Sequence, residues 1–159
     1  MNIFPFEVQH ASGVVDLILP IQQIEFEVPV SLEAQPDLQE IPRFYQHGNG
    51  NFWVAVHAQE VVGTVALLDI GNNQVALRKM FVGAGYRGPR HGTASRLLGT
   101  VVAWCQARGV QEIYLGTTAK FLAAHRFYEK NGFHEIARTA LPASFPVMLV
   151  DTKFYRRVL

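Results

Sequence analysis

The chain has 159 residues, of which 49% are hydrophobic and 17% charged, and it has a formal net charge of +1 and one cysteine. This composition excludes a disordered chain and predicts one domain, residues 1–159, with a substantial apolar core. No apolar run is long enough for a membrane span, and a single cysteine excludes an internal disulfide framework and a CxxC metal site. Because the first ten residues lack the pattern of a secretory signal, we expect a cytoplasmic protein.

The first half of the chain predicts one strand, two helices and then three strands. Residues 2–9 alternate as a strand, residues 12–26 predict a helix kinked at Pro20, and residues 31–45 predict an irregular helix. Three strands follow, at residues 52–58, 61–70 and 74–82. Gly71-Asn72-Asn73 predicts a tight hairpin between the last two strands.

The second half contains the clearest helix. Its apolar residues recur at helical spacing up to a C-terminal cap at Gly109: Ala94, Leu97, Leu98, Val101, Val102 and Cys105. After it the pattern predicts, in order, a strand at 111–115, a helix at 119–130, and strands at 133–139 and 148–158. The fold class is therefore mixed α/β, with a strand–helix–strand unit at its centre.

Charge is distributed unevenly along the chain. Residues 1–69 contain nine carboxylates and one base, Arg43, whereas residues 70–159 contain thirteen Lys or Arg and four acids. An acidic front and a basic back suit two ligands of opposite charge, although chance clustering on a solvated surface gives the same pattern.

A glycine-rich turn leads from the third central strand into the long helix. Residues 85–94 read Gly-Tyr-Arg-Gly-Pro-Arg-His-Gly-Thr-Ala. Such a turn exposes backbone N–H groups at a helix N-terminus, where partial positive charge attracts phosphate, and Arg87 and Arg90 add charged donors. The alternative is a plain loop that needs its glycines for geometry. A nucleotide P-loop is excluded because no Gly-Lys-Ser/Thr follows.

Two segments together resemble the signatures of one enzyme superfamily. Residues 87–94, followed by Leu97-Leu98, are similar to motif A of the GNAT N-acetyltransferases, and residues 124–133 (AHRFYEKNGF) resemble that superfamily's "FYEKxGF" segment. The resemblance covers about residues 75–135 and implies a GNAT-like fold, in which a mixed, mostly antiparallel sheet of about six to seven strands is flanked by about four helices. It also implies direct transfer from acetyl-CoA to a primary amine in a ternary complex, with no metal.

The resemblance assigns the coenzyme contacts to two segments. The backbone of Met80, Phe81 and Val82 would face the pantetheine arm, in an opening between this strand and residues 111–115. The pyrophosphate would lie on the turn, at Arg87, Gly88, Arg90, His91, Gly92, Thr93 and Ala94. Pro89 stands where the superfamily has Gln or Arg and has no N–H to donate, so we expect the two arginines to compensate.

Tyr128 and Phe127 come from the second segment. In many members of the superfamily the tyrosine protonates the departing thiolate, which a weakly acidic phenol can do at neutral pH. The alternative is a tyrosine of the core. Phe127 is expected to be a wall of the coenzyme site or part of the core.

The base that deprotonates the amine is expected among the acids of the front half. Glu25 and Glu27 follow the first helix, where this superfamily frames the acceptor, and His125 and His91 are alternatives. A pocket framed by Glu25, Glu27 and Glu33 would favour a cationic amine, unless these acids merely face solvent. Cys105 lies on the apolar face of its helix, which indicates a buried, inert thiol.

The sequence is also compatible with two other classes of function. One is a non-catalytic acyl-CoA-binding sensor, against which Tyr128 argues. The other is a nucleic-acid-binding module using residues 78–108, but the bases crowd one turn instead of spreading over a groove-sized face, so we expect no nucleic-acid partner. The basic residues of the last strand suit the surface of a homodimer.

Overall fold

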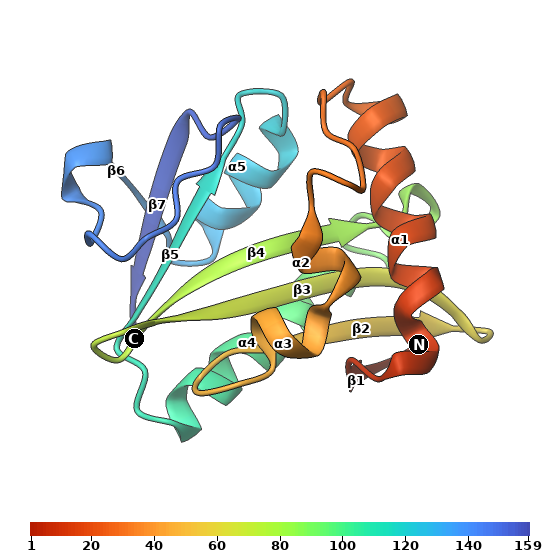
Figure 1. Ribbon diagram of the computed structural model, residues 1–159, viewed down its shortest axis with the longest axis horizontal. Helices are drawn as coiled ribbons and strands as arrows, with labels where there is room; N and C mark the ends of the chain where they lie inside the picture. Colours follow the sequence, from red (N-terminus) through yellow and green to blue (C-terminus); the bar gives the residue numbers. More distant parts are fainter.

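The computed structural model describes all residues, 1–159, and contains one seven-stranded sheet with the order β1-β2-β3-β4-β5-β7-β6 (Figure 1). The strands are β1 (Asn2–Pro5), β2 (Asn51–His57), β3 (Glu60–Gly71), β4 (Gln74–Val82), β5 (Glu112–Thr117), β6 (His134–Ile136) and β7 (Lys153–Val158). All neighbouring strands are antiparallel except β4 and β5, which are parallel. The expected mixed, mostly antiparallel sheet is confirmed.

Five α-helices cover the two faces of this sheet (Figure 1). They are α1 (Ala11–Pro20), α2 (Pro36–Gln39), α3 (Ile41–Tyr45), α4 (Thr93–Ala107) and α5 (Leu122–Lys130). The short turns η1 (Val8–His10), η3 (Ala84–Tyr86) and η4 (Arg138–Ala140) are 3-10 helices, and η2 (Ile21–Glu25) is a π-helical turn. None of the helices combines the length and apolar character needed to cross a bilayer.

Each face of the sheet has its own apolar core. On one side α4 packs through Leu97, Leu98, Val101 and Cys105, the face that its helical spacing predicts. On the other side Val14 and Ile18 of α1 pack with residues of α2 and α3 against β2 and β3. Burial raises the pKa of the Cys105 thiol to about 12, which fits the expected inert side chain.

Several predicted elements differ from the structure: the strand expected at 2–9 ends at Pro5, and the strand expected at 133–139 spans only His134–Ile136. The helix expected at 12–26 changes at Pro20 from α1 to the π-helical turn η2, at the residue where the sequence predicted a break. The irregular helix is two short helices, since Pro36 and Pro42 each occupy a first-turn position, where proline is favoured. The last strand begins at Lys153 and not at residue 148.

A turn delays the start of β7. The Asp151 carboxylate accepts a hydrogen bond from the Met148 N–H at 2.9 Å, and the Asp151 N–H donates to the Met148 carbonyl at 3.0 Å. β7 then lies between β5 and β6, so it is an inner strand of the sheet.

Candidate active site

The parallel strands β4 and β5 separate to form a cavity. They pair only through residues 74–76 and 112–114, and beyond this point they diverge (Figure 1). The cavity has a volume of about 490 Å³ and is walled by residues 77–82 of β4, residues 115–118 at the end of β5 and one face of α5. Parts of η2, of the segment after it and of the loop at 145–151 complete the wall. This is the opening that the resemblance implied, and Met80, Phe81 and Val82 line it.

The glycine turn lies at the mouth of this cavity. Gly92, in the left-handed conformation (φ 63°), is the N-cap of α4 and leaves the first turn of the helix without a side-chain cap. Gly88 is also left-handed (φ 93°), and its carbonyl accepts hydrogen bonds from the N–H groups of His91 and Gly92. Such a loop opening a 15-residue helix offers backbone donors to an anion.

The predicted turn residues are not all equally close to the cavity. Arg87, Gly88 and Ala94 line it, whereas Arg90 and His91 are exposed on the loop outside the cavity wall. The Thr93 side chain is buried, and its hydroxyl lies 3.3 Å from the Met1 sulfur. Thr93 therefore has only its backbone to offer an anion.

Arg87 joins the turn to η2 through Glu25. Its guanidinium makes a two-point ion pair with the Glu25 carboxylate, in which Nη2 lies 2.7 Å from Oε1, and its Nε donates to the Val82 carbonyl at 2.8 Å. The hydrogen bonds from Arg87 hold the pKa of Glu25 below its ordinary value. A carboxylate of lowered pKa is a weaker base, so this geometry does not favour Glu25 as the proton acceptor.

The acids expected to frame the acceptor lie outside the cavity wall. Glu25, Glu27 and Glu33 are all exposed, and none of them lines the cavity. In the segment after η2 it is the alternate residues Phe26, Val28 and Val30 that do so. None of the three carboxylates expected to frame the acceptor therefore lies in the cavity wall, because the apolar side chains of this segment take the inner positions.

Tyr128 lies on α5, in the wall of the cavity, and is buried. Its ring packs at 5.5 Å from that of Phe133 and 6.1 Å from that of Tyr155, between centroids. Burial raises the pKa of its hydroxyl. This hydroxyl makes no hydrogen bond within the chain, and its oxygen retains some exposure at the cavity. Phe127 lines the cavity as well.

The two candidate histidines lie away from the cavity wall. His125 is buried, with Nε2 3.0 Å from the Thr118 carbonyl, and His91 packs on the Tyr86 ring at 5.8 Å. No group of three or more His, Cys, Asp or Glu side chains in the chain could hold a metal ion.

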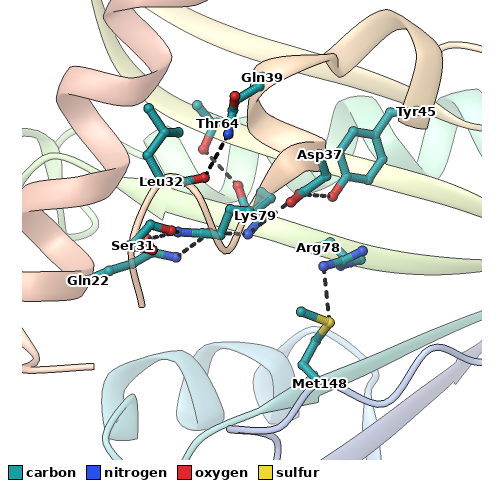
Figure 2. Close-up of polar contacts among 11 residues, drawn as sticks. Gln22, Ser31, Leu32, Asp37, Gln39, Tyr45, Thr64, Arg78, Lys79 and Met148 are labelled. Carbon is teal, nitrogen blue, oxygen red and sulfur yellow. Dashed lines mark hydrogen bonds and ion pairs between the residues drawn. The ribbon is translucent and has the colours of Figure 1, made fainter. Parts of the chain in front are cut away.

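A buried polar network forms one wall and was not foreseen from the sequence (Figure 2). Lys79 donates to the Gln35 Oε1 and lies 3.5 Å from the Asp37 carboxylate, which accepts a hydrogen bond of 2.6 Å from the Tyr45 hydroxyl. Gln22 and Gln35 exchange amide hydrogen bonds of 3.1 and 2.9 Å. Burial lowers the pKa of Lys79, and the Asp37 charge opposes this change.

A bulge in β4 places Lys79 on the same face as its neighbour Arg78. Ala66 pairs with Arg78 and Thr64 with Phe81, so that Val65 alone faces two residues of β4. Lys79 has a positive φ of 52°, and its carbonyl accepts a hydrogen bond from the Thr64 hydroxyl at 2.7 Å. Regular alternation would point these two bases to opposite faces. The only trace in the sequence was a pair of adjacent bases in an otherwise apolar strand.

Asp151 is the only carboxylate in the cavity wall, and it too was missed. Burial raises its pKa, although the Met148 N–H and the positive charge of Arg78 lower it. A carboxylate whose pKa is raised is a stronger base than an ordinary aspartate, so Asp151 is a candidate proton acceptor in this wall.

A split pair of parallel strands, a cavity and a glycine turn at its mouth define the class of protein. The model of the acetyltransferase (GNAT) family matches residues 16–133, and the chain belongs to this family. The chain is also 40% identical to an acetyltransferase of the GNAT family from Staphylococcus aureus Mu50, with a TM-score of 0.94 and coverage of 99% of this chain and 98% of that one.

Two further proteins are similar to the chain, one over part of its length and one at lower identity. The N-acetylaspartate synthetase of Danio rerio is 37% identical over 105 residues, which are 65% of this chain and 36% of that protein. The chain therefore matches about a third of the length of this curated relative. The PaiA N-acetyltransferase of Thermoplasma acidophilum, whose structure contains coenzyme A, has the same fold with a TM-score of 0.77, 16% identity and full coverage of both chains.

Proposed function

We propose that the chain is an acetyl-CoA-dependent N-acetyltransferase that acetylates a primary amine by direct transfer in a ternary complex. The observation that carries the proposal is the cavity between β4 and β5, which opens beside the glycine turn at the N-terminus of α4. The coenzyme A in the Thermoplasma protein of the same fold and the names of the relatives support it.

The coenzyme would lie with its pyrophosphate on the turn and its pantetheine arm along β4. The N–H groups of Gly88, Thr93 and Ala94 would donate to the phosphates, while Arg90 and His91 complete the positive surface of the turn. Arg87 would turn from Glu25 toward the pyrophosphate or share its donors between the two. Pro89 adds no donor at this place.

The transfer itself needs three things from the chain. A backbone N–H from residues 80–82, on the edge of β4 that β5 leaves free, would polarise the thioester carbonyl. The amine nitrogen attacks this carbon, the C–S bond breaks, and Tyr128 gives its proton to the thiolate. The proton that the amine loses would pass to Asp151, directly or through a water molecule. Positioning and electrostatics supply the acceleration.

In this proposal Glu25 positions Arg87 and is not the base that the sequence predicted. Its ion pair with Arg87 would hold the arginine at the cavity mouth until the coenzyme arrives, while Asp151 accepts the proton. The name of the Danio rerio relative supports an N-acetylated amino acid as the product. We therefore propose an amino acid as the acceptor, in place of the cationic amine expected from the charge pattern.

The test combines coenzyme binding with turnover. Calorimetry should detect acetyl-CoA binding by the wild-type chain, and binding should weaken at least about tenfold in the Arg87→Ala, Arg90→Ala double variant. An exposed arginine far from the turn, Arg43, provides the matched control Arg43→Ala. Release of CoA with a panel of amines then measures transfer. Binding without any turnover would support an acyl-CoA sensor, and absence of binding would overturn the proposal.

A further inference from the structure

Arg78 is a half-buried charge in the cavity wall without a counter-ion. Its guanidinium contacts the Met148 sulfur through Nη2 at 3.3 Å and lies 5.9 Å from the centre of the Tyr45 ring (Figure 2). It takes part in none of the ion pairs within 4.0 Å. A guanidinium has five N–H donors, and a thioether and a ring face satisfy few of them.

Lys79 adds a second positive charge beside it. The bulge in β4 places both side chains on one face, and Asp37 and Gln35 hold the Lys79 ammonium in position. The charged residues of the cavity wall are Arg78, Lys79, Arg87 and Asp151, which gives three positive charges against one negative. Arg87 is engaged with Glu25 at the mouth and Lys79 with Asp37, so Arg78 is the positive charge of the cavity wall that has no ion-pair partner.

A positive charge held in a partly dry cavity is costly unless an anion or a dipole faces it. Lys79 has such a partner in Asp37, whereas Arg78 has none. A carboxylate matches the planar fork of a guanidinium and accepts two parallel hydrogen bonds from it. The coenzyme phosphates would not be the anion that faces Arg78, because the proposed function places them at the N-terminus of α4.

Asp151 completes the arrangement from the other wall. The Asp151 and Arg78 charges influence each other but lie too far apart for an ion pair. A zwitterionic acceptor between them would direct its ammonium toward Asp151 and its carboxylate toward Arg78. Apolar residues from both sides provide surface for a short hydrocarbon part: Val28, Val30, Phe145, Pro146 and Val150.

We infer that the acceptor is a small amino acid whose carboxylate is bound by Arg78, with Lys79 as the second positive charge. The inference rests on the proposed function, because it names the acceptor of that transfer. Arg78 is then the residue that sets specificity, and the network of Lys79, Asp37 and Tyr45 positions the wall around it.

The experiment compares amino acids with their amides, in which the negative charge of the carboxyl group is removed. The pairs are glycine with glycinamide and aspartate with its diamide. The enzyme is assayed as the wild type, Arg78→Gln, Arg78→Lys and the surface control Arg43→Gln. Since amidation also changes the pKa of the amine, the diagnostic quantity is the acid-to-amide ratio of kcat/KM in each variant relative to the wild type.

In the wild type, the acids should be the better substrates. Arg78→Gln should lower the acid-to-amide ratio roughly 10- to 100-fold, the loss expected for a charged hydrogen bond. Arg78→Lys should recover part of it, Arg43→Gln should leave it unchanged, and the affinity for CoA should stay constant in all variants. Equal use of acids and amides, or an Arg78→Gln variant with an unchanged ratio, would overturn the inference.

A binding measurement separates this inference from the proposed function. Calorimetry of the CoA-bound protein with N-acetylglycine and N-acetylaspartate should show binding that depends on Arg78. If no amine is turned over but this Arg78-dependent binding occurs, the carboxylate site stands and the transferase proposal fails. If turnover occurs without dependence on Arg78, the transferase stands and the carboxylate site fails. Absence of both overturns both.

Discussion

At the scale of single residues, four buried tyrosines differ in what their hydroxyl groups contact. Three of the hydroxyls donate to a carboxylate: Tyr45 to Asp37 at 2.6 Å, Tyr114 to Glu112 at 3.0 Å and Tyr155 to Glu129 at 2.7 Å. Tyr128 has no hydrogen-bond partner in the chain. The Tyr128 hydroxyl lies at the cavity wall without a partner from the chain, so it is free to contact a bound ligand, which favours a role in chemistry over one in packing alone. Its raised pKa keeps Tyr128 protonated throughout the neutral range, as a proton donor requires.

Replacing Tyr128 with phenylalanine should therefore separate catalysis from stability. We expect Tyr128→Phe to lower kcat roughly 10²- to 10⁴-fold while the affinity for CoA and the melting temperature change little, because no hydrogen bond within the chain is lost. Steady-state kinetics and thermal unfolding measure the two effects. Tyr155→Phe is the matched control and should lower the melting temperature more than it lowers kcat. An unchanged kcat in Tyr128→Phe, when transfer is rate-limiting, would place Tyr128 in the core alone.

The pH dependence of kcat should distinguish Asp151 from Glu25. A base acts in its ionised form, so kcat should rise as the pH increases through the pKa of that base. Burial raises the pKa of Asp151, whereas Arg87 lowers that of Glu25, so an Asp151 base gives an acid limb at higher pH than an ordinary aspartate. We expect Asp151→Asn to abolish this limb and lower kcat, and Glu25→Gln to preserve both. The opposite pattern would return the proton-accepting role to Glu25.

At the scale of elements, the site depends on how β4 is held by its neighbours. The β4 bulge, α2 and α3 bring together Lys79, Asp37 and Tyr45, one from each element. Gly50, just before β2, lets α3 and β3 approach closely: a Cβ there would lie 2.4 Å from the Tyr45 carbonyl and 2.7 Å from that of Leu67. Both atoms belong to the backbone and cannot move aside easily.

Two glycine substitutions should consequently act in opposite directions on stability. Gly50→Ala should destabilise the chain by about 1–3 kcal/mol through overpacking, and it should also disturb the Tyr45 end of the network. Gly99→Ala, within α4, meets no atom within 4 Å and should stabilise by about 0.5–1 kcal/mol through helix propensity. Unfolding in denaturant gives both free energies. A Gly50→Ala variant as stable as the wild type would show that the backbone adapts there.

At the scale of the whole molecule, one sheet behaves as two halves. β1 to β4 form one half and β5 to β7 the other, and the strand pairing between the two halves is limited to residues 74–76 and 112–114. The separation frees one edge of β4 at residues 80–82, where the backbone groups have no strand partner on the β5 side. A ligand that inserts between the halves can supply these hydrogen bonds.

Acetyl-CoA should therefore slow amide hydrogen exchange in a pattern that follows this separation. We expect added protection at residues 80–82 and in the turn at 87–94, and little change at residues 74–76, which pair with β5 already. Exchange followed by mass spectrometry or NMR measures this directly. Protection confined to the turn would indicate that the pantetheine arm does not lie along β4.

Local features of the sequence determined much of this fold. The apolar spacing of residues 94–105 defined α4, and the Gly71-Asn72-Asn73 turn defined the hairpin of β3 and β4, because periodicity and turn chemistry depend on near neighbours. The two segments at 87–94 and 124–133 indicated the GNAT family, to which the chain belongs. These features also led to the opening between β4 and β5, and to Tyr128 in its wall.

Only the tertiary structure decided which charged groups meet in the cavity. The sequence indicated Glu25, Glu27 and Glu33 for the acceptor, yet Arg78 and Asp151 line the cavity in their place. Lys79 meets Asp37 from 42 positions away along the chain, through a bulge that reverses the alternation of β4. The register of a bulge and the pairing of distant strands come from packing between elements, and no local pattern records them.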